Sequence, residues 1–526
     1  MESTITLPGI ELEPKPLAEP RPATLAAADE DLTGRERRYR PIDRGQTVMH
    51  PVDVEHLLAE DDPARHIWEL LGELNLSRYR ERIRAVEERA GRPPYDPRLL
   101  ASLWILAYSQ GISSGHEIER LCHYQPQYMW LTGCRPVSCT TLCEFRRIDP
   151  EAQRQMFAEV LGVMMDKGLV TLERAFQDGT KMQACASADT FRGQEKIEAK
   201  VIEARQWIEQ LEQQAQDGEK PSPQKVAAAK RQLEKRELAR EELKKLQAVK
   251  AKKNKGPESA KVSLTDPEAR MMKKRHGGYE PSLNAQIVAD GEQGMVVAAF
   301  LTQSASDAEA LIEGIRQTET NTGSKPKQKV ADGGYATNRN AAETEQMGVE
   351  LYSPPGDHAA RSVAACKRWK IGEAFRPEAF QYREAEDCMV CPAGKILVFG
   401  RRCADEKTGE VRYSYEAKPA DCQGCPNKAQ CCPLNKKGRT VSRAEMPPAM
   451  ARLKARMNSE EAKAIYAKRK QVIELVNAWL KAKLGLRQFR LQGLIKNGME
   501  LLWACLAFNI RIWLRVRGTL SPAPPG

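Results

Sequence analysis

Three carboxylates of this chain are spaced so that they could hold a divalent metal ion. Asp178 and Asp332 each end an apolar run, and each is followed by a glycine that lets the backbone turn away and leaves the carboxylate exposed. Glu474 lies in a helical pattern, and Lys481, seven residues later, points from the same helix face. Three hard oxygen ligands suit Mg²⁺ or Mn²⁺, and phosphodiester chemistry uses two such ions to activate the attacking oxygen and steady the leaving one. Taken singly, each Asp-Gly pair indicates only a turn.

The helix that carries Glu474 is predicted over residues 459–484. Ser459 is a good N-cap residue and Gly485 is a natural stop. One buried stripe at helical spacing is formed by Ile465, Val472, Val476 and Leu480. A second face carries Tyr466, Lys470, Glu474 and Lys481. A solvated face with ordinary i,i+4 ion pairs gives the same pattern, so a metal site also needs carboxylates from other elements.

A sheet is required to bring Asp178 and Asp332 together. Residues 169–176 form a short apolar run that predicts a buried strand ending at Asp178, with residues 181–186 as its hairpin partner. Later strands are predicted at residues 282–288, 294–301, 327–331 and 349–352, and helices at residues 307–318 and 337–347. This order predicts a mixed sheet with helices on its faces, and the ends of parallel neighbours in such a sheet can lie side by side.

Helical patterns fill the region before the first strand, residues 39–168. The last short helix there is predicted at residues 139–147. Its polar residues include Thr140, Thr141, Arg146 and Arg147. Short helices joined by turns that contain glycine are typical of a helix-turn-helix module, whose second helix binds DNA. A plain helical bundle fits the pattern equally well.

An inserted helical hairpin is predicted at residues 190–255. In its first half, apolar residues step by four and three, which is the spacing of a heptad seam. These residues are Ile197, Val201, Ala204, Ile208, Leu211 and Ala215. Gly218 breaks the seam, and a second helix follows from about residue 224. The pattern favours a structural role over a catalytic one.

A second constellation consists of two CxxC motifs. Their cysteines are Cys388, Cys391, Cys422 and Cys425. Thiolates at this spacing accept tetrahedral Zn²⁺, which predicts one closed structural zinc site. Further cysteines nearby are Cys403, Cys431 and Cys432, of which Cys431 is the first substitute ligand. Thiols without metal are the alternative, and a redox role is disfavoured because neither motif opens a helix after a strand.

Composition limits the possible partners, the cellular location and the state of the cysteines. The 526 residues include 82 Lys and Arg against 71 Asp and Glu, a formal net charge of +11, which permits a polyanionic partner without requiring one. No apolar segment follows a basic start, so no secretory signal is expected. Residues 501–508 are apolar but too few to span a bilayer, and predict a buried core helix. In a cytoplasmic protein the 14 cysteines are expected to be free thiols or metal ligands.

The pattern around Glu474 resembles the terminal catalytic helix of bacterial insertion-sequence transposases of the DDE type, whose signature is Y-(2)-R-(3)-E-(6)-K. The matching residues are Tyr466, Arg469, Glu474 and Lys481. Here four residues instead of three separate the arginine from the glutamate, and Lys470 has the family spacing. The segments FQDGT around Asp178 and VADGGY around Asp332 resemble the family's two Asp motifs. Residues 39–147 resemble its InsH-type N-terminal domain.

The resemblance implies an RNase H-like catalytic domain in which Asp178, Asp332 and Glu474 bind Mg²⁺ or Mn²⁺. The implied reaction is cleavage at insertion-sequence ends, followed by transfer of the freed 3′-hydroxyl into target DNA. Contacts to double-stranded DNA, as terminal inverted repeats or target, are expected from Tyr466, Arg469, Lys470, Lys481, Thr140, Thr141, Arg146 and Arg147. A catalytically inactive DNA-binding regulator and a metal-dependent DNA nuclease are the two alternatives.

The predicted fold class is α/β: an RNase H-like mixed sheet flanked by helices, with an all-α N-terminal domain, an inserted helical hairpin and a small Cys-rich subdomain. The predicted parts are a disordered tail at residues 1–38, a helical DNA-binding domain at 39–168, a catalytic domain at 169–356 and 456–516, a helical hairpin at 190–255, a zinc-ribbon-like insertion at 357–455 and a flexible tail at 517–526. A cytoplasmic, nucleoid-associated bacterial protein is expected, without a membrane partner. A homodimer is compatible with this function.

Overall fold

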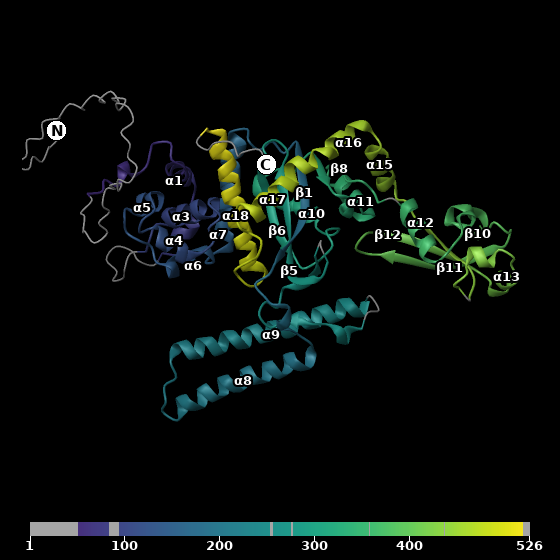
Figure 1. Cartoon of the computed structure of the whole chain (residues 1–526), viewed down its shortest axis with the longest axis horizontal. Helices are drawn as coiled ribbons and strands as arrows, with labels where there is room; N and C mark the ends of the chain where they lie inside the picture. The colour runs from purple at the N-terminus through teal and green to yellow at the C-terminus, as the bar shows by residue number, and fades with distance from the viewer. Residues whose placement is uncertain are drawn as a thin grey trace, which may run out of the picture. The chain divides into compact units, whose positions relative to one another are not determined.

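The computed structural model describes residues 51–83, 94–252, 256–274, 277–356, 358–435 and 437–518. The tail predicted at residues 1–38 lies outside these residues, as does most of the tail predicted at 517–526. The described residues from Asp53 onward belong to one contact unit. Figure 1 shows the elements, coloured from the N-terminus to the C-terminus.

The region before the sheet contains helices and no strand among its described residues. These are α1 (Pro63–Glu73), α2 (Ser77–Arg80), α3 (Pro97–Ser109), α4 (Gly115–Leu121), α5 (Pro126–Thr132), α6 (Cys139–Arg146) and α7 (Pro150–Asp166), preceded by the 3₁₀ turn η1 (Glu55–Leu57). Asp62, Asp96 and Asp149 each accept a backbone N–H in the first turn of α1, α3 and α7, just before a proline at the first helical position. An aspartate cap followed by proline fixes where a helix begins.

The central sheet has six strands: β1 (Arg174–Gln183), β4 (Arg270–Lys273), β5 (Tyr279–Asp290), β6 (Val296–Thr302), β7 (Gln328–Ala331) and β8 (Glu350–Tyr352). The order is β4-β5-β1-β7-β8, and β6 also pairs with β5. β5 is antiparallel to β1, β4 and β6, whereas β1, β7 and β8 run parallel. Helices α10 (Leu311–Thr322) and α11 (Asn338–Gln346) separate the later strands. The mixed sheet, its accompanying helices and the helical region before it confirm the predicted α/β class.

The first strand differs from its prediction. β1 does not end at Asp178 but continues to Gln183, so residues 181–186 are not a hairpin partner. Its partner is the long strand β5, which pairs with it from Ala175 opposite Asp290 to Gln183 opposite Ser282. Gly179 therefore lies within a strand. A Cβ atom there would collide with the Asp307 carboxylate. Glycine is therefore needed so that the Asp307 side chain can approach the β1 backbone, and not to form a turn.

Helix α18 (Leu494–Val516) joins the N-terminal helices to the sheet, since it contacts α3, α7 and β6 (Figure 1). The Trp503 indole donates to the Arg146 carbonyl at 3.2 Å. Asn509 accepts from Val296 N and donates to Val296 O, both at 2.7 Å. Residues 501–508 are buried, as predicted for a core helix. No helix in the described part of the chain is long and apolar enough to cross a membrane.

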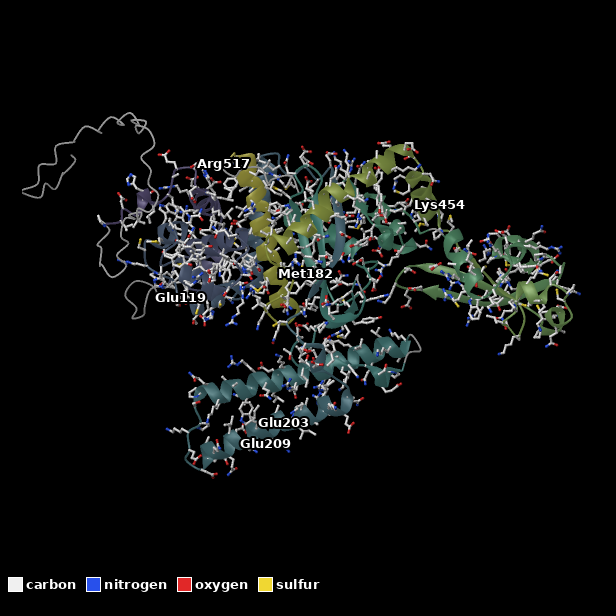
Figure 2. All side chains as sticks on the ribbon, viewed as in Figure 1. Glu119, Met182, Glu203, Glu209, Lys454 and Arg517 are labelled. Atoms are coloured by element: carbon white, nitrogen blue, oxygen red, sulfur yellow. The ribbon has the colours of Figure 1, made fainter. Side chains whose placement is uncertain are left out.

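The helical hairpin consists of α8 (Gln194–Gln216) and α9 (Pro223–Lys252). Four members of the predicted seam are buried: Ile197, Val201, Ala204 and Leu211. Glu203 and Glu209, on α8, are exposed (Figure 2). The buried Glu242 of α9 forms an ion pair with Arg270 of β4 and accepts from Gln303, so α9 is attached to the sheet by a buried carboxylate.

The Cys-rich region forms a five-stranded antiparallel sheet in the order β13-β12-β11-β10-β9. Its elements are α12 (His358–Arg368), β9 (Gln381–Arg383), β10 (Cys388–Val390), β11 (Ile396–Asp405), β12 (Glu410–Ala417), α13 (Pro419–Gln423), α14 (Lys428–Cys431) and β13 (Thr440–Ala444). Its apolar core consists of Phe380, Met389, Leu397, Tyr415, Ala417 and Val441. This region thus has a core of its own, larger than the sequence suggested.

Candidate active site

Two neighbouring parallel strands position Asp178 and Asp332. The β1–β7 ladder pairs Gln177 with Ala331, and each aspartate is the next residue. At Asp332 the chain leaves β7, and its carboxylate accepts a hydrogen bond from Gly334 N at 2.8 Å. Asp178 remains in β1, because that strand continues along β5. The two aspartates therefore follow paired residues of adjacent parallel strands, and the negative charge of Asp332 contributes to the raised pKa of Asp178.

The helix that carries Glu474 has three parts: α16 (Glu460–Ala467), a π-helical turn η8 (Lys470–Glu474) and α17 (Leu475–Ala482). Ser459 is its N-cap and accepts from Ala462 N at 3.2 Å. Gly485 has the left-handed φ of 72° that a helix stop requires. The predicted helix is therefore present, with a π-turn that the sequence pattern did not indicate.

The π-turn contains one residue more than an α-turn, and it changes which side chains share a face. Ile473 is fully buried, whereas Val472, predicted in the buried stripe, is only partly buried. Arg469, five residues before Glu474, contacts that carboxylate at 3.0 Å. The extra residue relative to the Y-(2)-R-(3)-E signature is thus absorbed by the π-turn. Lys470 is exposed and does not replace Arg469.

Deletion of Gln471 is expected to preserve the fold, because the π-turn can close to an α-turn with Arg469 still one turn before Glu474. The melting temperature should change by about 2–4 °C, the effect of ~1 kcal/mol in a domain of this size. Deletion of Ala478 is the matched control, since it rotates Lys481 away from Glu474 by about 100°. Equal destabilisation by the two deletions in a thermal melt would contradict this reading of the π-turn.

Arg469 also reaches Asp178, and so connects the helix to the sheet. Its second terminal nitrogen lies 2.8 Å from Asp178 Oδ1, and Asn477 Nδ2 donates to Asp178 Oδ2 at 3.0 Å. Burial raises the pKa of Asp178 to about 6, against the lowering effect of Arg469. Burial also lowers the pKa of Arg469, but the carboxylates around it outweigh this and raise that pKa above its ordinary value. Arg469 therefore carries its charge here.

The two remaining residues of the signature lie on either side of Arg469 along the helix. The Lys481 ammonium donates to Thr180 Oγ1 and to the Lys181 carbonyl of β1. Burial lowers the pKa of Lys481, while Asp178 acts in the opposite direction. Tyr466 is partly buried, and burial raises the pKa of its hydroxyl. Both side chains are thus held near the carboxylates.

Behind the carboxylates lies a network of amide and hydroxyl groups that the sequence did not reveal. Gln286 of β5 accepts from the Tyr335 hydroxyl at 2.6 Å and from Gln177 Nε2 at 3.1 Å. Its own amide donates to Asp307 Oδ1 at 2.6 Å, and Asn284 donates to the same oxygen at 2.7 Å. These bonds fix β1, β5 and the end of η4 (Gly333–Tyr335) relative to one another. No spacing rule connects such residues, so only the fold brings them together.

The donor set suits a hard divalent cation. Asp178, Asp332 and Glu474 offer carboxylate oxygens, and a positively charged guanidinium already bridges two of them. Within the described ranges, however, no group of three or more His, Cys, Asp or Glu side chains is gathered closely enough to hold a metal ion. Arg469 is the cation that contacts Asp178 and Glu474 in this structure.

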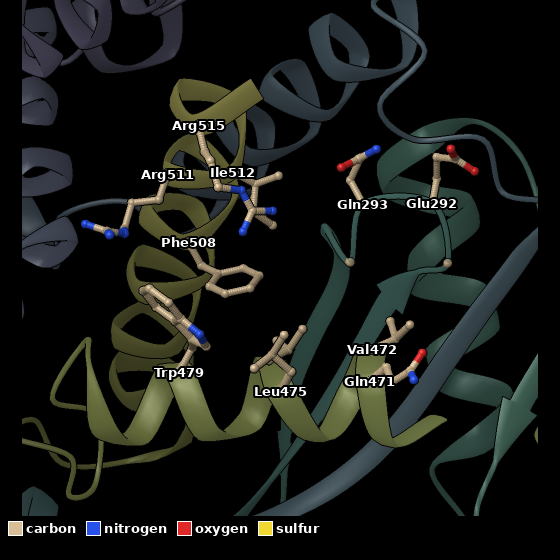
Figure 3. A pocket seen from close by; sticks show the side chains of 13 residues that line it. Glu292, Gln293, Gln471, Val472, Leu475, Trp479, Phe508, Arg511, Ile512 and Arg515 are labelled. Carbon is tan, nitrogen blue, oxygen red and sulfur yellow. The ribbon is translucent and has the colours of Figure 1, made fainter. Parts of the chain in front are cut away.

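A pocket beside the helix that carries Glu474 has none of the three carboxylates in its lining (Figure 3). Its walls come from the β5–β6 turn, from the helix residues Gln471, Leu475 and Trp479, and from α18. Arg511 of α18 lies over the Trp479 ring at 5.2 Å and donates to a carbonyl of α3. This pocket is therefore separate from the carboxylate site.

The candidate DNA-binding residues of α6 do not share one environment. Thr140 and Arg147 are exposed, and Thr141 is partly exposed beside the N-cap Ser138. Arg146 is buried: it donates to the Ser113 carbonyl at 2.9 Å and lies over the Trp104 ring. The prediction of Arg146 as a DNA contact is wrong, because its guanidinium is enclosed in the core.

The CxxC cysteines are only partly brought together. Cys391, Cys422, Cys425, Cys431 and Cys432 line one small cavity. Backbone N–H groups donate to two of these sulfurs, from Lys395 to Cys391 at 3.3 Å and from Arg439 to Cys422 at 3.4 Å. Cys388 does not line this cavity, and its thiol lies 3.4 Å from a Glu386 oxygen. Burial raises the pKa of Cys431 to about 12, so that its free thiol stays protonated.

Two protein-family profiles match this chain. The profile described as a transposase DDE domain matches residues 390–513, which include Glu474 and Lys481. The profile described as a transposase domain (DUF772) matches residues 52–147, which include α1 to α6. A search of curated proteins gives no match.

Among solved structures, the chain is similar to the cryo-EM structure of the piggyBac transposase synaptic complex with hairpin DNA. The identity is 9%, the TM-score is 0.24, and the similarity covers 88% of this chain and 86% of that chain. This TM-score is too low to support a conclusion about fold or partner. The two profiles identify a transposase DUF772 domain in the N-terminal part of the chain and a transposase DDE domain in its C-terminal part, and the DDE domain indicates a phosphoryl-transfer enzyme of DNA transposition.

Proposed function

We propose that Asp178, Asp332 and Glu474 hold divalent metal ions, and that the enzyme cleaves DNA at insertion-sequence ends and joins the freed ends to target DNA. The observation that carries this proposal is the shared guanidinium. Arg469 touches both Asp178 and Glu474, which come from a strand and a helix far apart in the sequence, and Asp332 lies on the next parallel strand. Mg²⁺ bound there would supply positive charge that stabilises the attacking and leaving oxygens of an in-line displacement at phosphorus.

In this proposal the positively charged side chains around the carboxylates bind the phosphate backbone of DNA. Lys481 is held against β1 by Thr180, so its ammonium is placed near the scissile phosphate before DNA arrives. Arg469 offers a planar fork that suits a phosphate. Tyr466 lies one turn earlier and Lys470 is exposed on the same helix, where both can reach the duplex. The helical region at residues 39–168 then supplies the sequence-specific part of DNA binding.

Within the N-terminal helices, Arg147, Thr140 and Thr141 are the proposed DNA contacts. Arg147→Gln is expected to weaken binding to end DNA about tenfold, or ~1.4 kcal/mol, in the lower part of the range for a single specific contact. Arg154→Gln, on the exposed side of α7, is the matched control and should change affinity little. Gel-shift titration at fixed salt measures both, and equal effects would remove α6 from the interface.

We further propose that the Cys-rich region holds one structural Zn²⁺. The proposed ligands are Cys391, Cys422, Cys425 and Cys431, with Cys431 in place of the predicted Cys388. The support is chemical: four thiols face one small, mostly apolar cavity, and backbone N–H groups donate to two of the sulfurs. Four thiolates around one ion form a closed, non-catalytic site.

The proposed reaction is tested with duplex DNA taken from the flanks of the gene, together with a target plasmid and Mg²⁺. Cuts at the terminal inverted repeats, followed by covalent joining to the plasmid, are the expected products. A duplex with scrambled terminal repeats is the control. Cutting without joining would favour the nuclease alternative, and specific binding without cutting would favour the inactive regulator.

A further inference from the structure

Arg469 lies among the carboxylates and not in solvent. Its terminal nitrogens contact Asp178 Oδ1 at 2.8 Å and Glu474 Oε1 at 3.0 Å, and only 12% of the side chain is exposed. The third nitrogen, Nε, is buried and has no hydrogen-bond partner among the described residues. Arg469 therefore neutralises two carboxylates without being held by a full set of bonds.

The guanidinium and a divalent ion need the same oxygens. A Mg²⁺ or Mn²⁺ ion binds carboxylate oxygens at about 2.1 Å, closer than the hydrogen bonds that Arg469 makes to them. Two cations at adjoining positions in a partly buried site also repel each other strongly. Metal binding to Asp178 and Glu474 therefore requires Arg469 to withdraw.

We propose that Arg469 is an internal counter-cation that competes with the divalent metal for Asp178 and Glu474, and that a DNA phosphate releases it. This inference rests on the proposed function. A phosphate is the natural second partner, because a guanidinium binds it through the same two-pronged contact. Coupling of this kind is reciprocal, so DNA raises the affinity for metal and metal raises the affinity for DNA.

The consequence is a metal site that is completed mainly on DNA. Without a duplex, Arg469 keeps the carboxylates neutralised and the affinity for metal low. With a duplex bound, the guanidinium moves to the phosphate and the oxygens become free for metal. Arg469 is thus a positioning residue with two alternating anionic partners.

Mn²⁺ binding to the full chain, followed by the electron paramagnetic resonance signal of free Mn²⁺, tests this inference. Arg469→Gln is expected to bind Mn²⁺ about tenfold more tightly than the wild type in the absence of DNA, within the usual range of coupling between sites. Lys468→Gln is the matched control: it removes the same charge one residue away, on an exposed side chain, and should change the affinity by no more than about twofold. A duplex of end sequence should tighten Mn²⁺ binding by the wild type but not by Arg469→Gln.

Arg469→Lys guards against an effect of misfolding. It keeps the charge but loses the fork, so an affinity between those of the wild type and Arg469→Gln is expected. An Arg469→Gln variant that binds Mn²⁺ no more tightly than the wild type would overturn the inference. Asp178→Ala separates this from the proposed function. If Asp178→Ala binds Mn²⁺ as the wild type does, the metal site itself is misassigned; if it loses Mn²⁺ while Arg469→Gln gains nothing, only the competition fails.

Discussion

Replacing Asp178, Asp332 or Glu474 is expected to reduce DNA cleavage about a thousandfold or more. Asp178→Ala, Asp332→Ala and Glu474→Gln each remove one negatively charged ligand from the proposed two-metal site. The loss of several kcal/mol of charge stabilisation in the transition state corresponds to this factor, since each ~1.4 kcal/mol is tenfold in rate. Single-turnover cleavage of end DNA in Mg²⁺ measures it.

Binding of end DNA by the same three variants should stay within about threefold of the wild type, because duplex affinity comes mainly from cations elsewhere. Glu461→Gln, an exposed carboxylate in the first turn of the same helix, is the matched control and should cleave normally. Cleavage near the wild-type rate by any of the three variants would remove that residue from the proposed triad.

Cys422→Ser and Cys425→Ser are expected to abolish zinc binding, from about one equivalent per chain to nearly none, because a structural site needs all four thiolates. The Cys-rich region should then become sensitive to protease under native conditions. Its small apolar core leaves partial structure without metal, so local loosening is expected and not global unfolding. Metal analysis and limited proteolysis measure the two effects.

Two further substitutions decide between ligand sets. Cys431→Ser should lose zinc, whereas Cys388→Ser, whose thiol lies toward Glu386, should keep it. Cys403→Ser, on the exposed part of β11, is the control for serine substitution itself. Zinc retained in Cys431→Ser and lost in Cys388→Ser would restore the set that sequence spacing alone suggested. Zinc absent from the wild-type protein would mean that these thiols hold no metal.

The elements with local start and stop signals were predictable from sequence. Asp96 before Pro97 marks the start of α3, and Ser459 and Gly485 bound the helix of Glu474. Each signal acts through hydrogen bonds or backbone angles within a few residues, so no knowledge of the fold is needed. The buried stripe around Ile465 was visible for the same reason.

The errors arose where the deciding contact is distant in sequence. Gly179 follows Asp178 as a turn glycine would, but the long partner β5 and the Asp307 carboxylate give it a different role. Arg146 was assigned to DNA because it is a polar residue in the last helix of the predicted helix-turn-helix module. In the fold its guanidinium donates to the Ser113 carbonyl and lies over the Trp104 ring, contacts that periodicity cannot indicate.

The π-turn is an intermediate case. The sequence contained the signal, a spacing of four instead of three residues between Arg469 and Glu474, but two readings were open. Either Lys470 took over the position of the arginine, or the helix absorbed the extra residue. The exposed Lys470 and the Arg469–Glu474 contact favour the second reading. Helix geometry can deviate locally when tertiary contacts on both sides hold it in place.

Cleavage of the polypeptide by bound iron tests the assignment of Asp178, Asp332 and Glu474 most directly. Fe²⁺ replaces Mg²⁺ in the presence of end DNA, ascorbate and peroxide, and the hydroxyl radicals cut the backbone near the ion. Mass spectrometry should locate three cuts, each within a few residues of one of these carboxylates, and excess Mg²⁺ should suppress all three. Cuts confined to the Cys-rich region, or cuts that Mg²⁺ does not suppress, would contradict a shared metal site at the three carboxylates.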